Sequence, residues 1–537
     1  MSAIDRRTLL RFAGIASLAA WGVPSLTGCA SGGTGSVSNT GRDRTPWPVH
    51  RRLEGPAPDL KAGVDGALDA FFRYPATLSR SADQPGDGSD VTAFIPTYGP
   101  PPAPVESNRL WQAINQALGV NIKLNLVPIS EYKSKLTTLM ASNDLPDIIM
   151  IMPVPRVREF IAASCADISD YVGGNRVADY PNLANLPTVS WQSMGRIGGK
   201  IYGVPLSRAR AGNALHINRT AYDAAGAPLQ WTAEQFFESL KAVTGGRMYG
   251  FGAVSEDLGM PYHAASHKAP QQWRLEGGAF VHMSATEEYR AAIEFAAKCF
   301  QAGYYHPSSK TGTLADIMNL YYSQNVGAVM GNFMNYANGI YIDRVGDRFT
   351  TDLALSYGDG HWLGTGLFGY TVFKKASPER VKMLLRICDF LAAPFGTKEH
   401  ELVNHGVEGV HFTRGDGLLQ PTEPAAAENR NSLPIGRYIC CAPEYIFIPG
   451  KEQQVRHAFD IQNTLLSKGI ANPADGLASP TMDADGERLT RELADAVNAI
   501  ITGRAGMSTW DAAARRWRDG GGAKIADELA AEHAAGR

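Results

Sequence analysis

This sequence of 537 residues lacks the marks of several large protein classes. Beyond residue 29, no unbroken apolar run is long enough to cross a bilayer, which argues against a chain that spans the membrane repeatedly. The formal net charge is only -2, so no strongly basic field is present to attract nucleic acid. Because the chain is too long for one ordinary hydrophobic core, we expect at least two lobes.

Motifs of the common enzyme classes are also missing. The sequence contains no HExxH zinc motif, no phosphate-binding GxxxxGK[ST] loop and no serine on a strand-to-helix elbow. No Cys/His cluster has metal-ligand spacing, so we expect no cofactor and assign no metal ligands, while the binding of calcium is left open. Carboxylates are numerous, however, and an exported polysaccharide-active enzyme, a glycosidase or lyase with a cleft site, stays open as the alternative function.

The six cysteines form no recognisable disulfide framework. Cys299 and Cys388 lie on apolar helical faces, where cysteine behaves as a small buried hydrophobic residue. The vicinal pair Cys440 and Cys441 has no zinc spacing, and its disulfide state is left open. Apart from Cys29, the cysteines are an odd set: Cys165, Cys299, Cys388, Cys440 and Cys441.

The N-terminal residues 1–29 have the three parts of an export signal. Arg6 and Arg7 supply positive charge, residues 9–23 are mostly apolar, and the segment ends in Leu-Thr-Gly-Cys at Cys29. This ending resembles the lipobox of bacterial lipoproteins, and the residues around Arg6 and Arg7 also resemble a twin-arginine signal. The resemblance implies that Cys29 carries acyl chains such as palmitate. It places the protein at the extracytoplasmic face of the cell membrane, anchored by lipid.

Residues 30–90 have little pattern. Residues 30–48 are rich in Gly, Ser and Thr, which predicts a flexible tether, and residues 49–90 are expected to be an irregular extension. From residue 91 onward, strand and helix patterns alternate. The expected elements are strands at 91–95, 121–127 and 147–152, and helices at 106–118 and 131–142, the second capped by Ser130. Such alternation is typical of a doubly wound α/β unit.

Two short segments carry no catalytic chemistry but are informative in combination with Cys29. They are residues 144–148 (DLPDI) and 199–205 (GKIYGVP). Together they resemble family 1 of the extracellular solute-binding proteins, the carbohydrate-binding components of ABC importers, in its larger lipoprotein branch. Further landmarks in the same order are residues 215–222 (LHINRTAY), 325–332 (NVGAVMGN), 406–412 (GVEGVHF) and 508–511 (STWD).

The resemblance implies a two-lobed periplasmic-binding-protein-like fold, with doubly wound sheets joined by a multi-strand hinge and with extra C-terminal helices. Residues 91–210 with 326–363 are assigned to lobe 1, and residues 211–325 with 364–537 to lobe 2. The implied function is non-enzymatic: a monomeric receptor that captures a sugar or oligosaccharide in the cleft and delivers it to ABC permease subunits. A receptor that feeds a sensor or a surface scaffold is a further alternative.

Sugar sites favour aromatic platforms and planar or charged hydrogen-bonding groups. The resemblance places several such side chains in loops at the expected cleft. The candidate ligand-binding residues are Tyr98, Arg156, Arg208, Arg210, His263, Trp273, Asn332, Tyr336 and Trp362. An acidic sugar is favoured only if the arginines among them face the cleft.

Overall fold

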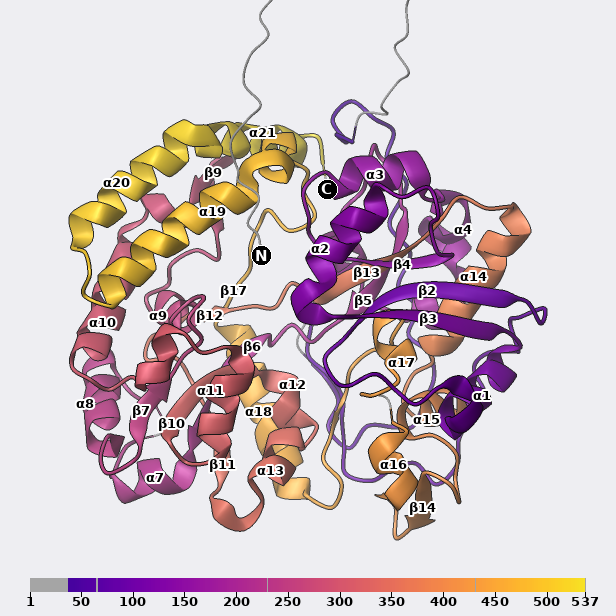
Figure 1. Cartoon of the computed structure of the whole chain (residues 1–537), viewed down its shortest axis with the longest axis horizontal. Coiled ribbons are helices and arrows are strands. Elements are labelled where there is room, and N and C mark those ends of the chain that lie inside the picture. The colour runs from indigo at the N-terminus through magenta and orange to yellow at the C-terminus, as the bar shows by residue number, and fades with distance from the viewer. Residues whose placement is uncertain (1–36, 64–65, 229, 430, 537) are drawn as a thin grey trace, which may run out of the picture. The chain divides into compact units, whose positions relative to one another are not determined.

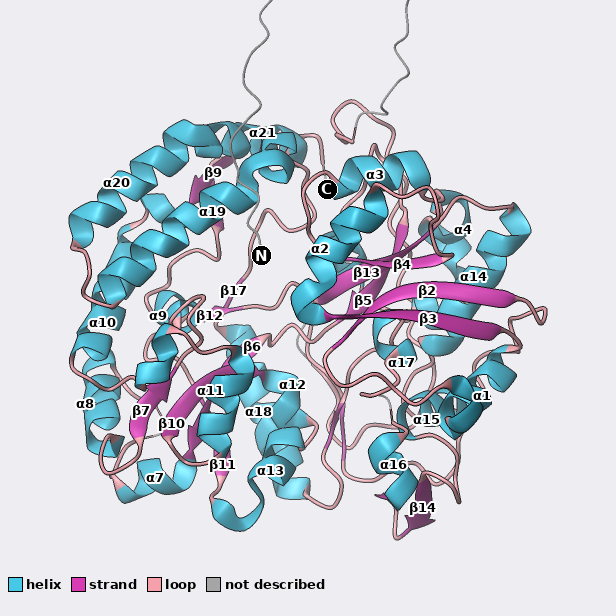
Figure 2. Ribbon diagram, viewed as in Figure 1, coloured by secondary structure: helices cyan, strands magenta, loops and turns pink. Residues whose placement is uncertain are grey.

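The computed structural model of the chain describes residues 37–63, 66–228, 230–429 and 431–536. Two β-sheets organise these residues, and helices lie on each (Figures 1 and 2). We call the five-stranded sheet with its helices the first lobe and the four-stranded sheet with its helices the second lobe. This arrangement confirms the predicted two-lobed α/β fold class.

The first-lobe sheet has the strand order β3-β2-β4-β13-β5. β2 is parallel to β3 and β4, whereas β13 is antiparallel to β4 and β5. The strands are β2 (Asp90–Thr97), β3 (Asn121–Pro128), β4 (Ile148–Ile151), β5 (Gly203–Ser207) and β13 (Leu367–Phe373). All four residues of β4 are buried, as expected for a central strand that is covered on both faces.

Capping residues set the ends of the first-lobe helices. Asn108 accepts a hydrogen bond from the Trp111 amide at the start of α1, and Gly119 ends this helix with φ of 65°. Ser130, the predicted cap of α2, lies inside that helix, which begins after Pro128. The main helices are α1 (Arg109–Leu118), α2 (Ile129–Met140), α3 (Val157–Ser164), α6 (Thr188–Met194), α14 (Pro378–Leu391), α15 (Lys398–His405) and α17 (Ile435–Tyr438).

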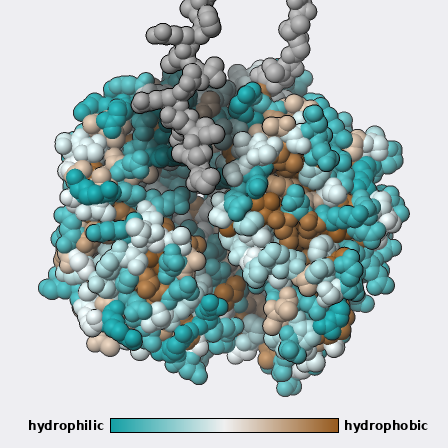
Figure 3. All heavy atoms as spheres, viewed as in Figure 1, coloured by the Kyte–Doolittle hydropathy of each residue, from teal (hydrophilic) through white to brown (hydrophobic). Residues whose placement is uncertain are grey.

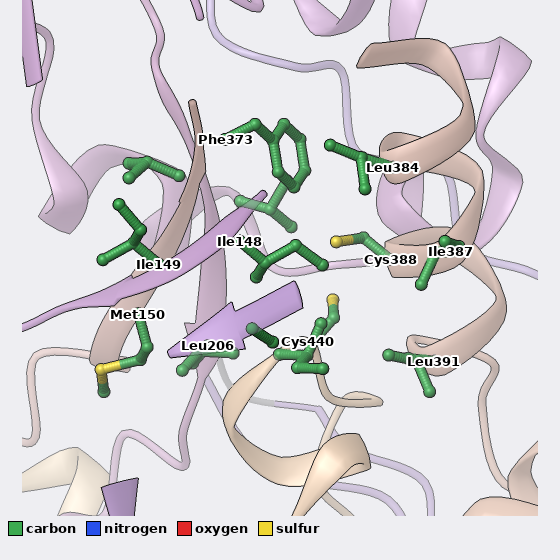
Figure 4. Close-up of a cluster of buried hydrophobic side chains, with 14 of the residues drawn as sticks. Ile148, Ile149, Met150, Leu206, Phe373, Leu384, Ile387, Cys388, Leu391 and Cys440 are labelled. Atoms are coloured by element: carbon green, nitrogen blue, oxygen red, sulfur yellow. The ribbon is translucent and has the colours of Figure 1, made fainter. Parts of the chain in front are cut away.

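The first-lobe core is mainly aliphatic (Figure 4). Helix α14 presents Leu384, Ile387 and Leu391 toward Ile148 and Phe373 of the sheet. Each of these side chains is almost completely buried, and burial of one such side chain contributes about 1.5–3 kcal/mol. The sheet and α14 therefore stabilise each other chiefly by apolar contact.

The second-lobe sheet has the order β11-β6-β10-β7. β10 is parallel to β7, and β6 runs antiparallel to both β10 and β11. The strands are β6 (Asn213–Asn218), β7 (Tyr249–Gly252), β10 (Val326–Asn332) and β11 (Thr351–Ala354). The helices near this sheet are α7 (Arg219–Ala224), α8 (Ala233–Val243), α9 (Met260–Ser266), α11 (Leu314–Tyr322), α12 (Phe333–Ala337), α13 (Ile340–Val345) and α18 (Glu452–Ser467).

The C-terminal helices extend the second lobe and are drawn in yellow in Figure 1. They share one apolar core with α9, with α10 (Glu287–Gln301) and with the hairpin of β8 (Trp273–Glu276) and β9 (Ala279–His282). These helices are α19 (Pro480–Ile501), α20 (Met507–Trp517) and α21 (Ala523–Ala534). The structure thus contains the extra C-terminal helices expected from the sequence.

The chain passes between the lobes at residues 208–212, 363–366 and 448–451. The predicted division of segments between the lobes is wrong after residue 325. Residues 326–363 supply β10 and β11 to the second sheet, and residues 367–373 return to the first sheet as β13. Interstrand pairing explains the difference, because β10 bonds to β6 and β7 and does not cross to the first lobe.

Residues 37–90 are more structured than the sequence suggested. β1 (Ala70–Phe71) pairs with β16 (Ile446–Phe447), and Ser79 forms a bridge with Thr397. The tether prediction is wrong for residues 37–48, because backbone and side-chain hydrogen bonds hold this stretch on the first lobe. Residues 30–36 of the predicted tether, the proposed signal segment and Cys29 lie outside the described residues.

Five cysteines are described, and each is a buried free thiol: Cys165, Cys299, Cys388, Cys440 and Cys441. Among the residues that the structure describes, no helix combines the length and apolar character needed to span a bilayer. The same residues contain no group of three or more potential metal-binding side chains.

Candidate ligand-binding site between the two sheets

Residues from both sheets line one pocket of about 390 Å³. Arg208 follows the carboxyl end of β5, while Asn332 and Ala354 lie at the carboxyl ends of β10 and β11. In open α/β sheets, ligands bind outside the carboxyl ends of the strands. Figure 3 shows a recess between the left and right parts of the molecule. Position and topology therefore indicate a ligand site.

Two of the three crossings form a wall of this pocket. The Gly364 amide donates to the Arg210 carbonyl oxygen (2.8 Å), and the Arg208 amide donates to Gly366 O (3.0 Å). Gly212 has φ of 62°, and a Cβ atom there would lie 2.7 Å from the Gly364 nitrogen. The crossings can approach each other this closely because glycine has no side chain.

The first lobe supplies an arginine and an aromatic cluster. Arg208 Nη1 donates to Ser207 O (2.7 Å) and contacts Cys441 Sγ (3.3 Å). Its guanidinium carbon lies 5.0 Å from the ring centroid of Phe368, which also lines the pocket. The Phe368 ring packs in turn on Tyr438 (5.3 Å) and Tyr98 (6.5 Å), and Tyr98 is 61% exposed. The group offers an apolar platform beside a fixed cation.

The second lobe and the crossings supply mainly neutral hydrogen-bonding groups. Trp362 Nε1 donates to Ala269 O (2.9 Å), which fixes the indole ring in the pocket wall. Burial lowers the pKa of His361, and its Nε2 donates to Ala211 O (2.7 Å), so the ring is neutral near pH 7. Gln271 Oε1 is a buried acceptor with no hydrogen-bond partner among the described residues. A ligand hydroxyl could satisfy it.

The pocket brings together only part of the predicted site. Arg208, Asn332 and Trp362 line it. Tyr98 is not among the lining residues, but its ring packs on Phe368, which is. Arg210 belongs to the crossings and donates from Nη1 to Gly364 O (2.7 Å).

Four other predicted residues lie elsewhere. Arg156 pairs with Glu159 on an exposed turn. His263 is fully buried, with its ring nitrogens 3.0 Å from Tyr357 Oη and 2.7 Å from Tyr305 Oη. Trp273 packs against Trp517 (5.7 Å between ring centroids), and Tyr336 is buried near α18. Packing within the second lobe places the last three side chains in its interior and not in the pocket.

Several pocket residues were missed from the sequence. Phe368, His361, Thr365 and Gln271 line the pocket, and Tyr438 supports Phe368. The glycines around Thr365 were a usable signal, since Gly364 and Gly366 marked a crossing whose neighbours had to lie near the cleft. Gln271 had no such signal, because its loop reaches the pocket only through the packing of the second lobe.

None of the described residues that line the pocket is an aspartate or a glutamate. Most glycosidases cleave their substrates with a pair of such carboxyl groups. The described lining therefore offers no such carboxyl pair.

Comparison with known proteins agrees with this geometry. A match to the bacterial extracellular solute-binding protein family covers residues 103–378, more than half of the chain. The chain belongs to this family, which consists of non-enzymatic receptors of ABC transporters. The enzyme alternative is therefore not supported.

Two proteins of Bacillus subtilis (strain 168) are similar to most of the chain. The polygalacturonan/rhamnogalacturonan-binding protein YtcQ is 23% identical over 443 residues, 78% of this chain and 87% of YtcQ. Lipoprotein LipO is 22% identical over 499 residues, 86% of this chain and 96% of LipO.

Solved structures share the fold at low identity. The HMO-binding solute-binding protein of Bifidobacterium longum infantis has a TM-score of 0.61 at 12% identity, covering 84% of this chain and 99% of that one. The N-glycan transport protein NgtS of Streptococcus pneumoniae has a TM-score of 0.61 at 14% identity, covering 83% of this chain and 98% of that one. These matches confirm the two-lobed fold.

Proposed function

We propose that this protein is a lipid-anchored extracytoplasmic receptor that captures a sugar or oligosaccharide between its lobes and delivers it to an ABC importer. The observation that carries the proposal is the pocket lined by residues from both sheets. Its aromatic rings suit the C–H faces of sugars, and its neutral amide, hydroxyl and imidazole groups suit their hydroxyls. The similarity to YtcQ, a polygalacturonan/rhamnogalacturonan-binding protein, and to NgtS, an N-glycan transport protein, supports the same ligand class.

Capture follows from the position of the pocket beside the crossings. A ligand that contacts Phe368 and Arg208 in the first lobe and Asn332 in the second gains its full set of contacts only when the lobes are close. Such a ligand shifts an open–closed equilibrium toward the closed form by its differential affinity for the two forms. The permease would then receive the closed, loaded receptor.

A pair of tryptophans allows a controlled test of the pocket. Trp362 and Trp111 each donate an indole hydrogen bond to a backbone oxygen, Ala269 O (2.9 Å) and Ile122 O (3.2 Å) respectively. Only Trp362 lines the pocket. Neutral and acidic oligosaccharides would be screened by calorimetry and thermal shift, and the best ligand would then be titrated into both alanine variants.

We expect Trp362→Ala to weaken binding about 30-fold, as for a central aromatic contact worth about 2 kcal/mol, and Trp111→Ala to leave the Kd unchanged. Equal effects of the two substitutions would show that the ligand does not bind in this pocket. A screen in which no carbohydrate bound would reject the proposal as a whole.

The membrane anchor is a separate part of the proposal and rests on the sequence around Cys29. Each buried methylene of an acyl chain contributes about 0.8 kcal/mol, so more than one chain would hold the receptor at the membrane. A Cys29→Ala protein should keep its sugar affinity and move from the membrane to the soluble fraction. Loss of affinity with unchanged membrane retention would contradict the assigned role of Cys29.

A scaffold or sensor receptor would share the sugar site but not the delivery step. Uptake of labelled ligand by cells that lack and then regain the gene distinguishes the two roles. Uptake that depends on the protein supports delivery, and ligand binding without any effect on uptake supports the sensor or scaffold role.

A further inference from the structure

The two lobes also touch at a place apart from the three crossings. Gly195, which follows α6 of the first lobe, lies against Gly476, which precedes α19 of the second lobe. A Cβ atom on Gly195 would be 2.5 Å from Gly476 O, and one on Gly476 would be 2.0 Å from Gln192 O. Nearby, Arg158 Nε of α3 lies 3.8 Å from Asp483 Oδ2 of α19. These contacts join the first lobe to the second directly.

Residues 37–47, which we call the strap, are bound firmly to the first-lobe side of this contact. Asn39 Oδ1 accepts a hydrogen bond from the Gly199 amide (2.8 Å). The Thr45 amide donates to Gly199 O (2.8 Å), and Arg196 Nε donates to Thr45 O (2.7 Å). The Arg196 guanidinium carbon also lies 3.8 Å from the ring centroid of Trp47.

The same strap binds a buried carboxylate of the second lobe. Glu532 of α21 is 2% exposed, and its Oε1 and Oε2 accept hydrogen bonds from Asn39 Nδ2 (2.5 Å) and Thr40 Oγ1 (3.3 Å). Arg44 Nη2 donates to the Glu532 carbonyl oxygen (3.4 Å). Helix α21 belongs to the second lobe, since Ile525 and Leu529 pack in the core formed with α10 and α19. In Figure 1, α21 and α3 lie on either side of the label that marks the C-terminus.

We propose that the strap is a latch that stabilises the closed arrangement by joining Arg196 and Gly199 of the first lobe to Glu532 of the second. Asn39 is its central residue, because one side chain bonds both lobes: Oδ1 to Gly199 and Nδ2 to Arg196 O (3.0 Å) and Glu532. The inference extends the closure mechanism proposed above, but it does not depend on which ligand the pocket takes.

The chemistry of the latch makes it both favourable and reversible. Hydrogen bonds to a charged carboxylate are stronger than neutral ones, and a buried carboxylate without donors is costly. Opening of the lobes exposes Glu532 to water, which replaces the donors of the strap. The latch therefore biases the equilibrium without locking it, as an open–closed receptor requires.

The test uses the full chain without sugar, so its failure is distinguishable from failure of the proposed function. Asn39→Ala and Glu532→Gln are compared singly and together. Asp527→Asn, an exposed position on α21 with the same change of charge as Glu532→Gln, is the control. Amide hydrogen exchange by mass spectrometry follows residues 470–478, which contain Gly476 of the contact between the lobes. Small-angle scattering follows the radius of gyration.

We expect each latch substitution to raise exchange in residues 470–478 about tenfold and to increase the radius of gyration. The double variant should show no more than the larger single effect, since both substitutions weaken the same Asn39–Glu532 contact. Wild-type behaviour of the latch variants, additive effects in the double variant, or an equal response of Asp527→Asn would overturn the proposal. If Glu532→Gln does not fold, the proposal is tested by Asn39→Ala alone. An unchanged melting temperature then shows that this variant is folded.

Discussion

The two lobes share an α/β plan but differ in what fills them. The first-lobe core is aliphatic, with Ile148, Phe373 and Leu384 between the sheet and α14. The second lobe encloses polar rings: His263 lies between the hydroxyls of Tyr305 and Tyr357, and His282 stacks on Trp517 at 3.8 Å. The first lobe thus depends mainly on apolar burial and holds a buried carboxyl, Asp389, whose pKa burial raises to about 7, so that acid does not weaken the lobe through this group. The second lobe depends partly on imidazoles that must stay neutral.

The largest expected difference between the lobes is that acid unfolds the second lobe first. Burial lowers the pKa of His216 to about 4 and those of His263 and His282 to about 3. The folded state therefore binds fewer protons than the unfolded state below the unfolded pKa of about 6.5, and stability falls as the pH drops toward the folded values. Each histidine contributes a loss of about 1.4 kcal/mol per pH unit in that window.

Hydrogen exchange measured at several pH values from 7 to 4.5 checks this prediction lobe by lobe. Burial raises the pKa of Asp257 to about 6, which offsets the loss from one histidine in part. We expect second-lobe peptides around His263 and His282 to lose protection first. Earlier opening of the first-lobe peptides around Ile148 would contradict the comparison.

A core truncation should have the next largest effect and should act on the first lobe. Ile148 is fully buried between the sheet and α14, so Ile148→Ala leaves a cavity there. We expect it to lower the free energy of unfolding by about 4 kcal/mol, by equal amounts at pH 7 and pH 5. Urea unfolding at the two pH values measures this, and a strongly pH-dependent loss would mean that the first-lobe core is not the apolar structure described.

A smaller effect is expected at the crossings that join the lobes. Gly212 and Gly226 have similar left-handed φ angles of 62° and 67°, but only Gly212 is crowded by backbone, while nothing lies within 4 Å of a Cβ on Gly226. Gly226→Ala should cost about 1 kcal/mol through conformation alone. Gly212→Ala should cost about 3 kcal/mol through conformation and overpacking together. Thermal unfolding measures the loss of stability in each variant. Equal losses would show that the two crossings can move apart and make room for a side chain at position 212.

The smallest effect compares one helix cap in each lobe. Thr232 caps α8 in a reciprocal capping box with Gln235, whereas Ser377 caps α14 with one hydrogen bond to the Arg380 amide. Substitution of either by alanine should cost about 1 kcal/mol. The second-lobe cap should cost more, because loss of the Thr232 hydroxyl also weakens the reciprocal bond in which Gln235 Oε1 accepts from the residue 232 amide (2.9 Å). Urea unfolding of the two variants measures the difference. A larger cost at Ser377 would reverse the order.

Local elements were predictable because their signals are local. The strands around Val91 and Ile148 and the helix expected at 106–118 lie within a few residues of their expected positions, since apolar periodicity and caps act over one or two turns. Which sheet β10 and β11 join was not predictable, because strand partners are set by contacts more than 100 residues away, such as the pairing of Ala328 with Ile217.

The candidate site was predictable only for residues that lie next to a strand end or a crossing in the sequence. Arg208, Asn332 and Trp362 follow or adjoin strand ends and crossings, and the structure places them in the pocket. His263 and Trp273 are similar residue types in similar loop-like sequence, yet the packing of the second lobe buries them. Residue type and loop context alone do not distinguish a ligand contact from a core aromatic.

The sequence by itself determined the α/β class, the absence of the sought catalytic motifs and the family landmarks, because these depend on composition, periodicity and short ordered motifs. Only the tertiary structure decided which segments form each lobe and which side chains meet in the pocket. It alone also showed that residues 37–47 bind Glu532, nearly 500 residues further along the chain. The physical reason is that hydrogen bonding and burial act between neighbours in space, and the fold chooses those neighbours.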